Sequence, residues 1–228
     1  MATHVKVLSA GAVQHGLSKL AEAFRLDGES TVEIEFATAP AIAKRIAAGY
    51  PTDIIVAPPD LLQTSTTTGL MASRTVPLGR IGVGVMVRAG APLPPIANAA
   101  EFEHSVQIAE RIIYNQASTG IYLDSLFQRL GIAATLEVKT VRYSDFAAVR
   151  RHIANGHGNE IGFGATTVIV EGADKGVTFV GPLPAEIQHY TAYAAALISN
   201  GGEGSAAAFL EYLATPAAKS ILRSAGIE

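Results

Sequence analysis

Three segments of this chain repeat one local pattern, in which an apolar strand runs into a short turn of small residues and a helix begins at once. They are residues 5–12, 32–40 and 111–120. The first N–H groups of a helix have no partner within the helix and carry partial positive charge, and small side chains let a ligand approach them. The pattern predicts an α/β fold with a pocket for a small anion.

Composition narrows the class of protein. The chain has 228 residues, 49% of them hydrophobic, which suffices for one large α/β unit or two smaller domains. The net charge is -3 and the Lys and Arg residues are scattered, which argues against nucleic acid as a partner. The absence of cysteine excludes disulfides, thiol catalysis and thiolate metal sites. No run of eighteen apolar residues occurs, so we expect no membrane span.

The spacing of apolar residues predicts two α/β domains joined by two crossing strands. Strands are expected at 32–36, 54–57, 111–114, 137–141 and 160–163, and helices at 41–48, 98–104, 121–130, 145–154, 205–214 and 217–224. Long apolar strands at 78–87 and 191–198 leave the first half and return to it. We therefore expect domain I at 1–80 and 193–228, domain II at 81–192, and a ligand cleft between them.

Several short motifs carry a resemblance to a known family. They are residues 8–12 (LSAGA), 36–39 (FATA), 45–49 (RIAAG), 52–56 (TDIIV), 161–163 (IGF) and 209–216 (FLEYLATP). In their order and spacing they resemble the molybdate-type solute-binding proteins of ABC transporters. The resemblance covers almost the whole chain and implies the type II periplasmic binding protein fold.

The resemblance also implies a pocket of hydroxyls and backbone amides, from which this chain departs. Ala12 stands where the family has a serine, and residues 38–40 (TAP) replace a serine run. One family backbone donor maps to Thr119 and another near Phe146, while the pocket tyrosine falls near Ala165. Missing hydroxyls weaken the case for molybdate, because a compact dianion without a countercharge depends on every donor.

A divergent subgroup of substrate-binding proteins resembles the chain more closely. It shares residues 78–80 (LGR), 87–92 (VRAGAP) and 180–184 (VGPLP). Aconitate isomerase is an enzyme whose scaffold resembles the same fold. The resemblance therefore implies either a carboxylate binder or a cofactor-independent isomerase of a small unsaturated tricarboxylate.

Candidate site residues follow from the turns and from the expected cleft. Arg80 could hold a carboxylate through two parallel hydrogen bonds, or it could pair with a neighbouring acid. His15 and His189 are candidate bases for an isomerase. The hydroxyls of the turns could bind a ligand, cap their helices, or do both. The predicted ligand contacts are Ser9, Ala10, Gly11, Ala12, Thr38, Ala39, Arg80, Ser118, Thr119 and Gly120.

Two functions from different classes remain open. The first is a solute-binding protein for a small organic or inorganic anion, with an ABC transporter permease as partner if the chain is exported. The second is the isomerase. Residues 1–4 lead directly into a strand without the features of a signal peptide, so the chain as written is expected to be cytoplasmic, and periplasmic if a signal precedes it. We expect a monomer without metal or cofactor.

Overall fold

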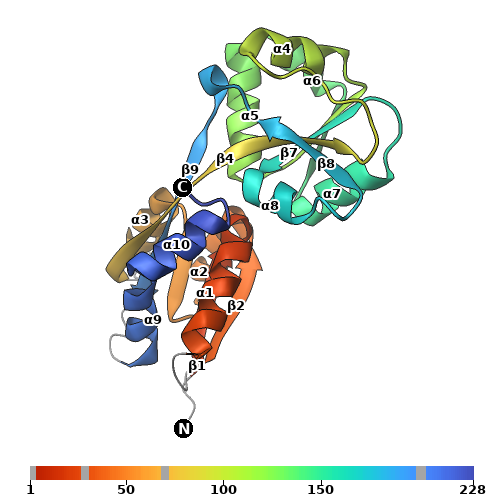
Figure 1. Ribbon diagram of the computed structural model, residues 1–228. Coiled ribbons are helices and arrows are strands. Elements are labelled where there is room, and N and C mark those ends of the chain that lie inside the picture. The colour runs from red at the N-terminus through yellow and green to blue at the C-terminus, as the bar shows by residue number, and fades with distance from the viewer. Residues whose placement is uncertain (1–3, 27–30, 68–71, 199–203) are drawn as a thin grey trace. The chain divides into compact units, whose positions relative to one another are not determined.

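The computed structural model describes residues 4–26, 31–67, 72–198 and 204–228. The chain forms two compact units, Met1–Ile81 with Thr191–Glu228, and Gly82–Tyr190. The long strands β4 (Ala72–Arg88) and β9 (Tyr190–Ile198) carry the chain from one unit to the other and back (Figure 1). The predicted α/β class with two crossing strands is confirmed.

Unit 1 is built on a mostly parallel sheet. β1 (His4–Ala10) pairs in parallel with β2 (Thr31–Ala37) and β3 (Ile54–Ala57), and β9 pairs antiparallel with β3. All four residues of β3 are buried, as expected for a strand covered on both faces. Its helices are η1 (Gly11–Val13), α1 (Gln14–Leu26), α2 (Ala39–Ala47), α3 (Pro59–Thr67), α9 (Ser205–Leu213) and α10 (Pro216–Ser224).

The helices of unit 1 pack through the apolar residues that the sequence pattern indicates. Leu17 and Leu20 of α1 are fully buried. The ring of Phe24 in α1 lies 5.1 Å from that of Phe209 and 5.4 Å from that of Tyr212, both in α9. Aromatic contacts at this spacing add to simple burial. They hold α1 against the helix that follows the return strand.

Unit 2 has a mixed sheet in the order β4-β7-β5-β6, with β8 also paired to β4. β5 (Arg111–Asn115) is parallel to β6 (Thr140–Tyr143) and β7 (Glu160–Ala165), whereas β4 is antiparallel to β7 and to β8 (Val177–Pro182). Its helices are α4 (Ala99–Ile108), α5 (Ser118–Arg129), α6 (Ala133–Glu137), α7 (Phe146–Asn155), α8 (Thr166–Glu171) and η2 (Ala185–Ile187).

Alternating residues of the unit 2 strands build two cores, one on each face of the sheet. Tyr114 and Phe163 belong to the core that also contains Phe102 of α4 and Phe127 of α5. Ile113 belongs to the other core, with residues of α7 and α8. α4 and α5 therefore cover one face, and α7 and α8 cover the other.

Only the last two residues of the predicted strand 137–141 lie in a strand. Glu137 ends helix α6, and β6 begins only at Thr140, whose hydroxyl donates to the carbonyl of Leu136 at 2.8 Å. The Lys139 ammonium donates to the carbonyls of Gln107 (2.5 Å) and Ala109 (2.7 Å) at the end of α4. These hydrogen bonds satisfy carbonyl groups at the ends of α6 and α4. The alternation of apolar residues in a short segment does not reveal such contacts. Helix α8 was also absent from the predicted elements, and β4 begins at Ala72 rather than at residue 78.

Gly79 is required where the last residues of the chain meet β4. Its φ is +140°, and a Cβ there would lie 2.5 Å from the carbonyl oxygen of Glu228. Arg80 and Glu228 exchange two backbone hydrogen bonds, of 2.8 and 3.0 Å. We expect Gly79→Ala to lower the free energy of unfolding in urea by about 1–3 kcal/mol. Gly181→Ala is the control, since its Cβ would make only an ordinary contact at 3.6 Å. Equal urea midpoints for the two variants would contradict this packing.

Candidate functional site

Two of the predicted turns lie side by side in unit 1. β1 and β2 are parallel, and Ala10 at the end of β1 is the register partner of Ala37 at the end of β2. η1 begins at Gly11 and α2 begins at Ala39, immediately after these partners. The structure therefore gathers the predicted turns 9–12 and 38–39 at one edge of the unit 1 sheet.

The first turn of α2 has backbone N–H groups that no side chain caps among the described residues. Thr38 is its N-cap residue and, within the described part of the chain, makes no side-chain capping hydrogen bond. Residues 39–42 (APAI) contain no acid, although Pro40 removes one N–H donor. A Cβ on Gly11 would meet no atom within 4 Å among the described residues. This edge therefore presents backbone donors beside unfilled space.

The third predicted turn lies at the corresponding edge of unit 2. Asn115 at the end of β5 is the register partner of Tyr143 at the end of β6, and β7 runs parallel to β5 on its other side. α5, α7 and α8 begin after these three strands (Figure 1). The carboxyl ends of parallel strands form one edge, so the starts of the three helices are neighbours.

Capping separates α5 from α7. The Asp145 carboxylate caps α7 by accepting from the Ala148 N–H at 2.8 Å, which places a negative charge at that helix start and disfavours an anion there. α5 follows Ala117, which has no side chain able to cap, and Ser118 and Thr119 are half-buried in its first turn. Of the two helix starts, that of α5 is the better candidate for an anion site, and the family donor predicted near Phe146 is the poorer candidate.

Gly120 lets α5 lie directly on the end of β5. A Cβ at this position would come 1.9 Å from the carbonyl oxygen of Asn115. The sequence suggested this glycine as a source of open backbone amides. In the structure it is also a requirement of packing, because only glycine permits so close an approach of helix and strand.

Ser9 and Arg80 occupy different surroundings in unit 1. The Ser9 side chain is fully buried, and its hydroxyl donates to the carbonyl of Ala10 at 3.2 Å. The Arg80 guanidinium is exposed and lies 3.5 Å from the Glu228 carboxylate. The pairing with a neighbouring acid, one of the two expectations for Arg80, is therefore present. Ligand contact by Ser9 or Arg80 stays a prediction.

The two candidate histidines also differ. His15 is half-buried at the second position of α1. His189 stacks on the ring of Tyr122 in α5, with 4.4 Å between ring centroids and 12° between the planes. Burial lowers the pKa of His189, and the nearby Arg129 lowers it further, so both favour the uncharged imidazole. Tyr122 follows Ser118 by four residues and shares its face of α5, so His189 stacks one helical turn beyond Ser118.

Sequence reasoning missed Tyr122 and Arg129 as parts of this site. The signal was present in the spacing of Ser118, Tyr122 and Arg129, four and then seven residues apart, which places all three on one helix face. The partner on that face, His189, comes from a distant segment. Local periodicity does not indicate which segment covers a helix.

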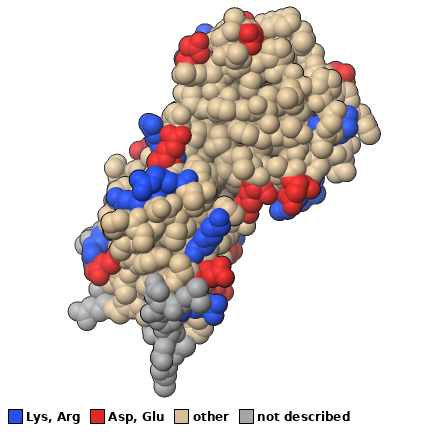
Figure 2. Space-filling view, in the orientation of Figure 1, with Lys and Arg blue, Asp and Glu red and all other residues tan. Residues whose placement is uncertain are grey.

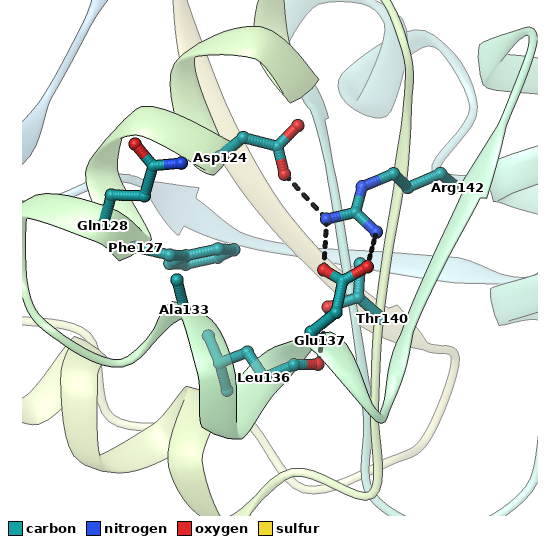
Figure 3. A pocket seen from close by; sticks show the side chains of 8 residues that line it. All are labelled: Asp124, Phe127, Gln128, Ala133, Leu136, Glu137, Thr140 and Arg142. Carbon is teal, nitrogen blue, oxygen red and sulfur yellow. Dashed lines mark hydrogen bonds and ion pairs between the residues drawn. The ribbon is translucent and has the colours of Figure 1, made fainter.

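A cavity of about 270 Å³ lies on another side of α5, against α6 and β6 (Figure 3). Its lining is Asp124, Phe127, Gln128, Ala133, Leu136, Glu137, Thr140 and Arg142. The Arg142 guanidinium donates to Asp124 at 2.9 Å and to both oxygens of Glu137 at 2.7 and 3.0 Å. The cavity contains two carboxylates and one guanidinium, and that guanidinium already pairs with both carboxylates. The cavity therefore does not suit an anion.

Charged side chains do not gather into a basic surface on the face drawn in Figure 2, where blue and red groups lie close together. Among residues 4–26, 31–67, 72–198 and 204–228, no group of three His, Asp or Glu side chains is placed to hold a metal ion. Across the same residues, no helix is both long enough and apolar enough to cross a bilayer.

Two glycine substitutions test the geometry of the turns. We expect Gly120→Ala to lower the free energy of unfolding by about 1–3 kcal/mol, because the added methyl group forces α5 away from Asn115. Gly11→Ala should change it by less than about 0.5 kcal/mol, since open space surrounds that position. Urea denaturation measures both. A stable Gly120→Ala variant would show that α5 does not rest on the end of β5 as described.

Comparison with known proteins identifies the family and the fold of this chain. The family of bacterial extracellular solute-binding proteins matches residues 5–228. An aconitate isomerase from Pseudomonas sp. is 28% identical over 236 aligned residues, covering 99% of this chain and 88% of that protein. The periplasmic molybdate-binding protein of Azotobacter vinelandii superposes with a TM-score of 0.80 at 18% identity, covering 98% of each chain.

The sulfate-binding protein of Mycobacterium tuberculosis superposes with a TM-score of 0.76 at 17% identity, over 99% of this chain and 86% of that one. These structures confirm the type II periplasmic binding protein fold that the motifs predict. Because the family match extends from the first strand to the last residue, the chain belongs to the bacterial extracellular solute-binding proteins.

Proposed function

We propose that this solute-binding protein holds a small anion, a carboxylate or an oxyanion, at the helix starts that follow its parallel strands. The observation that carries this proposal is the first turn of α5, Ser118–Gly120. It offers backbone N–H groups and two half-buried hydroxyls; among the described residues no side chain caps this helix, and its first turn contains no acid. Such a turn stabilises negative charge without a full countercharge.

Three of the proteins compared above support an anionic ligand. Two structural neighbours are described as binding molybdate and sulfate, and the sequence relative is described as acting on aconitate. All three compounds are anions. The family description as extracellular supports export of the natural protein and delivery of the ligand to an ABC transporter permease.

The residues of the turns favour an organic carboxylate over a tetrahedral oxyanion. Ala12 and Ala165 supply no hydroxyl or phenol. A compact dianion loses more from each missing donor than a larger, less densely charged carboxylate does. The imidazole of His189, which stacks on Tyr122 of α5 and whose pKa is lowered by burial, adds a group that can donate or accept a hydrogen bond.

Replacement of Ser118 tests the α5 turn. Isothermal titration calorimetry with cis-aconitate, trans-aconitate, citrate, molybdate and sulfate identifies which anion binds the wild-type protein. For that anion, Ser118→Ala should weaken binding roughly 10- to 150-fold, the value of a hydrogen bond to a charged group of about 1.5–3 kcal/mol.

The control is Ser18→Ala, which removes an exposed serine hydroxyl from α1 of unit 1. It should bind with the wild-type affinity. If Ser118→Ala and Ser18→Ala bind with equal affinity, the Ser118 hydroxyl does not contact the ligand. If the wild-type protein binds none of the five anions, the proposal of an anionic ligand is wrong.

A second candidate function is isomerisation of an unsaturated tricarboxylate. It is favoured by the relative described as aconitate isomerase and by the lowered pKa of His189, which favours the uncharged imidazole that can accept a proton. Proton NMR of the protein with cis- and trans-aconitate in heavy water separates the two functions. An isomerase interconverts the acids or exchanges an allylic proton for deuterium, and a binding protein only broadens the ligand lines.

A further inference from the structure

We propose that Tyr122 and Arg129 are positioning residues that hold the His189 ring against α5, one helical turn beyond Ser118, where His189 contributes one hydrogen bond to a carboxylate bound at the first turn of α5. This inference rests on the proposed function and deepens it, because it selects His189 over His15 and names the groups that fix its place.

The phenol of Tyr122 is held through its hydroxyl and through its ring. Its hydroxyl donates to the carbonyl of Ile187 at 2.6 Å, which ties α5 to the segment that carries His189. Arg129 donates to the same hydroxyl at 3.3 Å, and its guanidinium carbon lies 5.4 Å from the centre of the phenol ring. A cation over an aromatic face stabilises that ring in place. Tyr122 is therefore a fixed surface for the imidazole that stacks on it.

Arg129 is itself fixed on α5. It donates to the hydroxyl of Ser125, one turn earlier on the helix, at 3.2 Å. Ser118, Tyr122, Ser125 and Arg129 form a polar stripe along one face of α5. The stripe begins at the predicted anion turn and ends at the cation that supports the phenol.

The backbone of His189 is anchored independently of its ring. The Gln188 side chain accepts from the His189 N–H at 2.8 Å and from the Val83 N–H at 2.9 Å, and it donates to the Val83 carbonyl at 3.0 Å. Gly82 leaves room for this amide, since a Cβ there would lie 3.3 Å from it. The main chain is thereby attached to β4 while the ring is held by α5.

The distance along α5 suits a ligand at its first turn. Tyr122 lies one helical turn, about 5.4 Å, beyond Ser118, and His189 stacks on Tyr122 at 4.4 Å. A carboxylate bound by the first-turn amides would extend along the stripe toward the imidazole. A compact inorganic oxyanion would stay at the amides, so His189 selects for ligands with a second polar group.

The experiment compares Tyr122→Leu, Tyr122→Phe and Arg129→Met with Arg151→Met, a control that removes an exposed arginine from α7. Side-chain NMR of the ligand-free proteins follows nuclear Overhauser contacts between His189 and residue 122 and the titration of the imidazole. Calorimetry with cis-aconitate and with sulfate follows binding.

Tyr122→Phe should keep the ring contacts and lose less than threefold in affinity for cis-aconitate. In both Tyr122→Leu and Arg129→Met, the nuclear Overhauser contacts of His189 should be lost or dispersed. In Arg129→Met, the pKa of the His189 imidazole should also rise. Both variants should bind cis-aconitate at least tenfold more weakly, while their affinity for sulfate changes less than threefold. Arg151→Met should match the wild-type protein in every measurement.

Unchanged His189 contacts in Tyr122→Leu and Arg129→Met would overturn the positioning role, even if no anion binds. Scattered contacts with undiminished cis-aconitate affinity would overturn the ligand contact of His189. If the wild-type protein binds neither anion, the proposed function fails, and the ligand-free spectra still decide the positioning role.

Discussion

Parallel strand pairing is the constraint on which the rest of this structure depends. The register that sets Ala10 beside Ala37 in unit 1, and Asn115 beside Tyr143 in unit 2, brings separate turns to a common sheet edge. Each turn leads into a helix, so each edge gathers several helix starts with their partial positive charge. The proposed anion site follows from this pairing more than from any single side chain.

Capping decides which helix starts can bind a ligand. α4, α7 and α10 are capped by the side chains of Asn98, Asp145 and Thr215, each of which accepts from one N–H group in the first turn of its helix. α2 and α5 lack such a bond within the described residues. An N–H group at a helix start that has no partner is destabilising, and a bound anion can supply that partner. This is the physical reason for proposing the ligand site at these two helix starts.

The sequence alone predicted the fold well because its strongest signals are local. Strand and helix alternation, the small residues of the turns and Gly120 all act within a few neighbouring residues. Helix α6 at residues 133–137 was missed, and beside it Lys139 makes contacts with the distant end of α4 that no local pattern reveals. The pairing of Arg80 with Glu228 and the stacking of His189 on Tyr122 join distant segments. Such contacts need the tertiary structure, and they are the contacts that define the candidate site.

The measurement that tests the central claim most directly is a titration of the isotope-labelled protein with cis-aconitate and with sulfate, followed by backbone amide NMR. Binding at helix starts predicts the largest downfield shifts for the amides of Gly11, Ala39, Ser118, Thr119 and Gly120, because an anion that accepts their hydrogen bonds deshields those protons. The amides of the capped α7 start should change little. Shifts confined to the Arg142 cavity, or to the start of α7, would contradict the account.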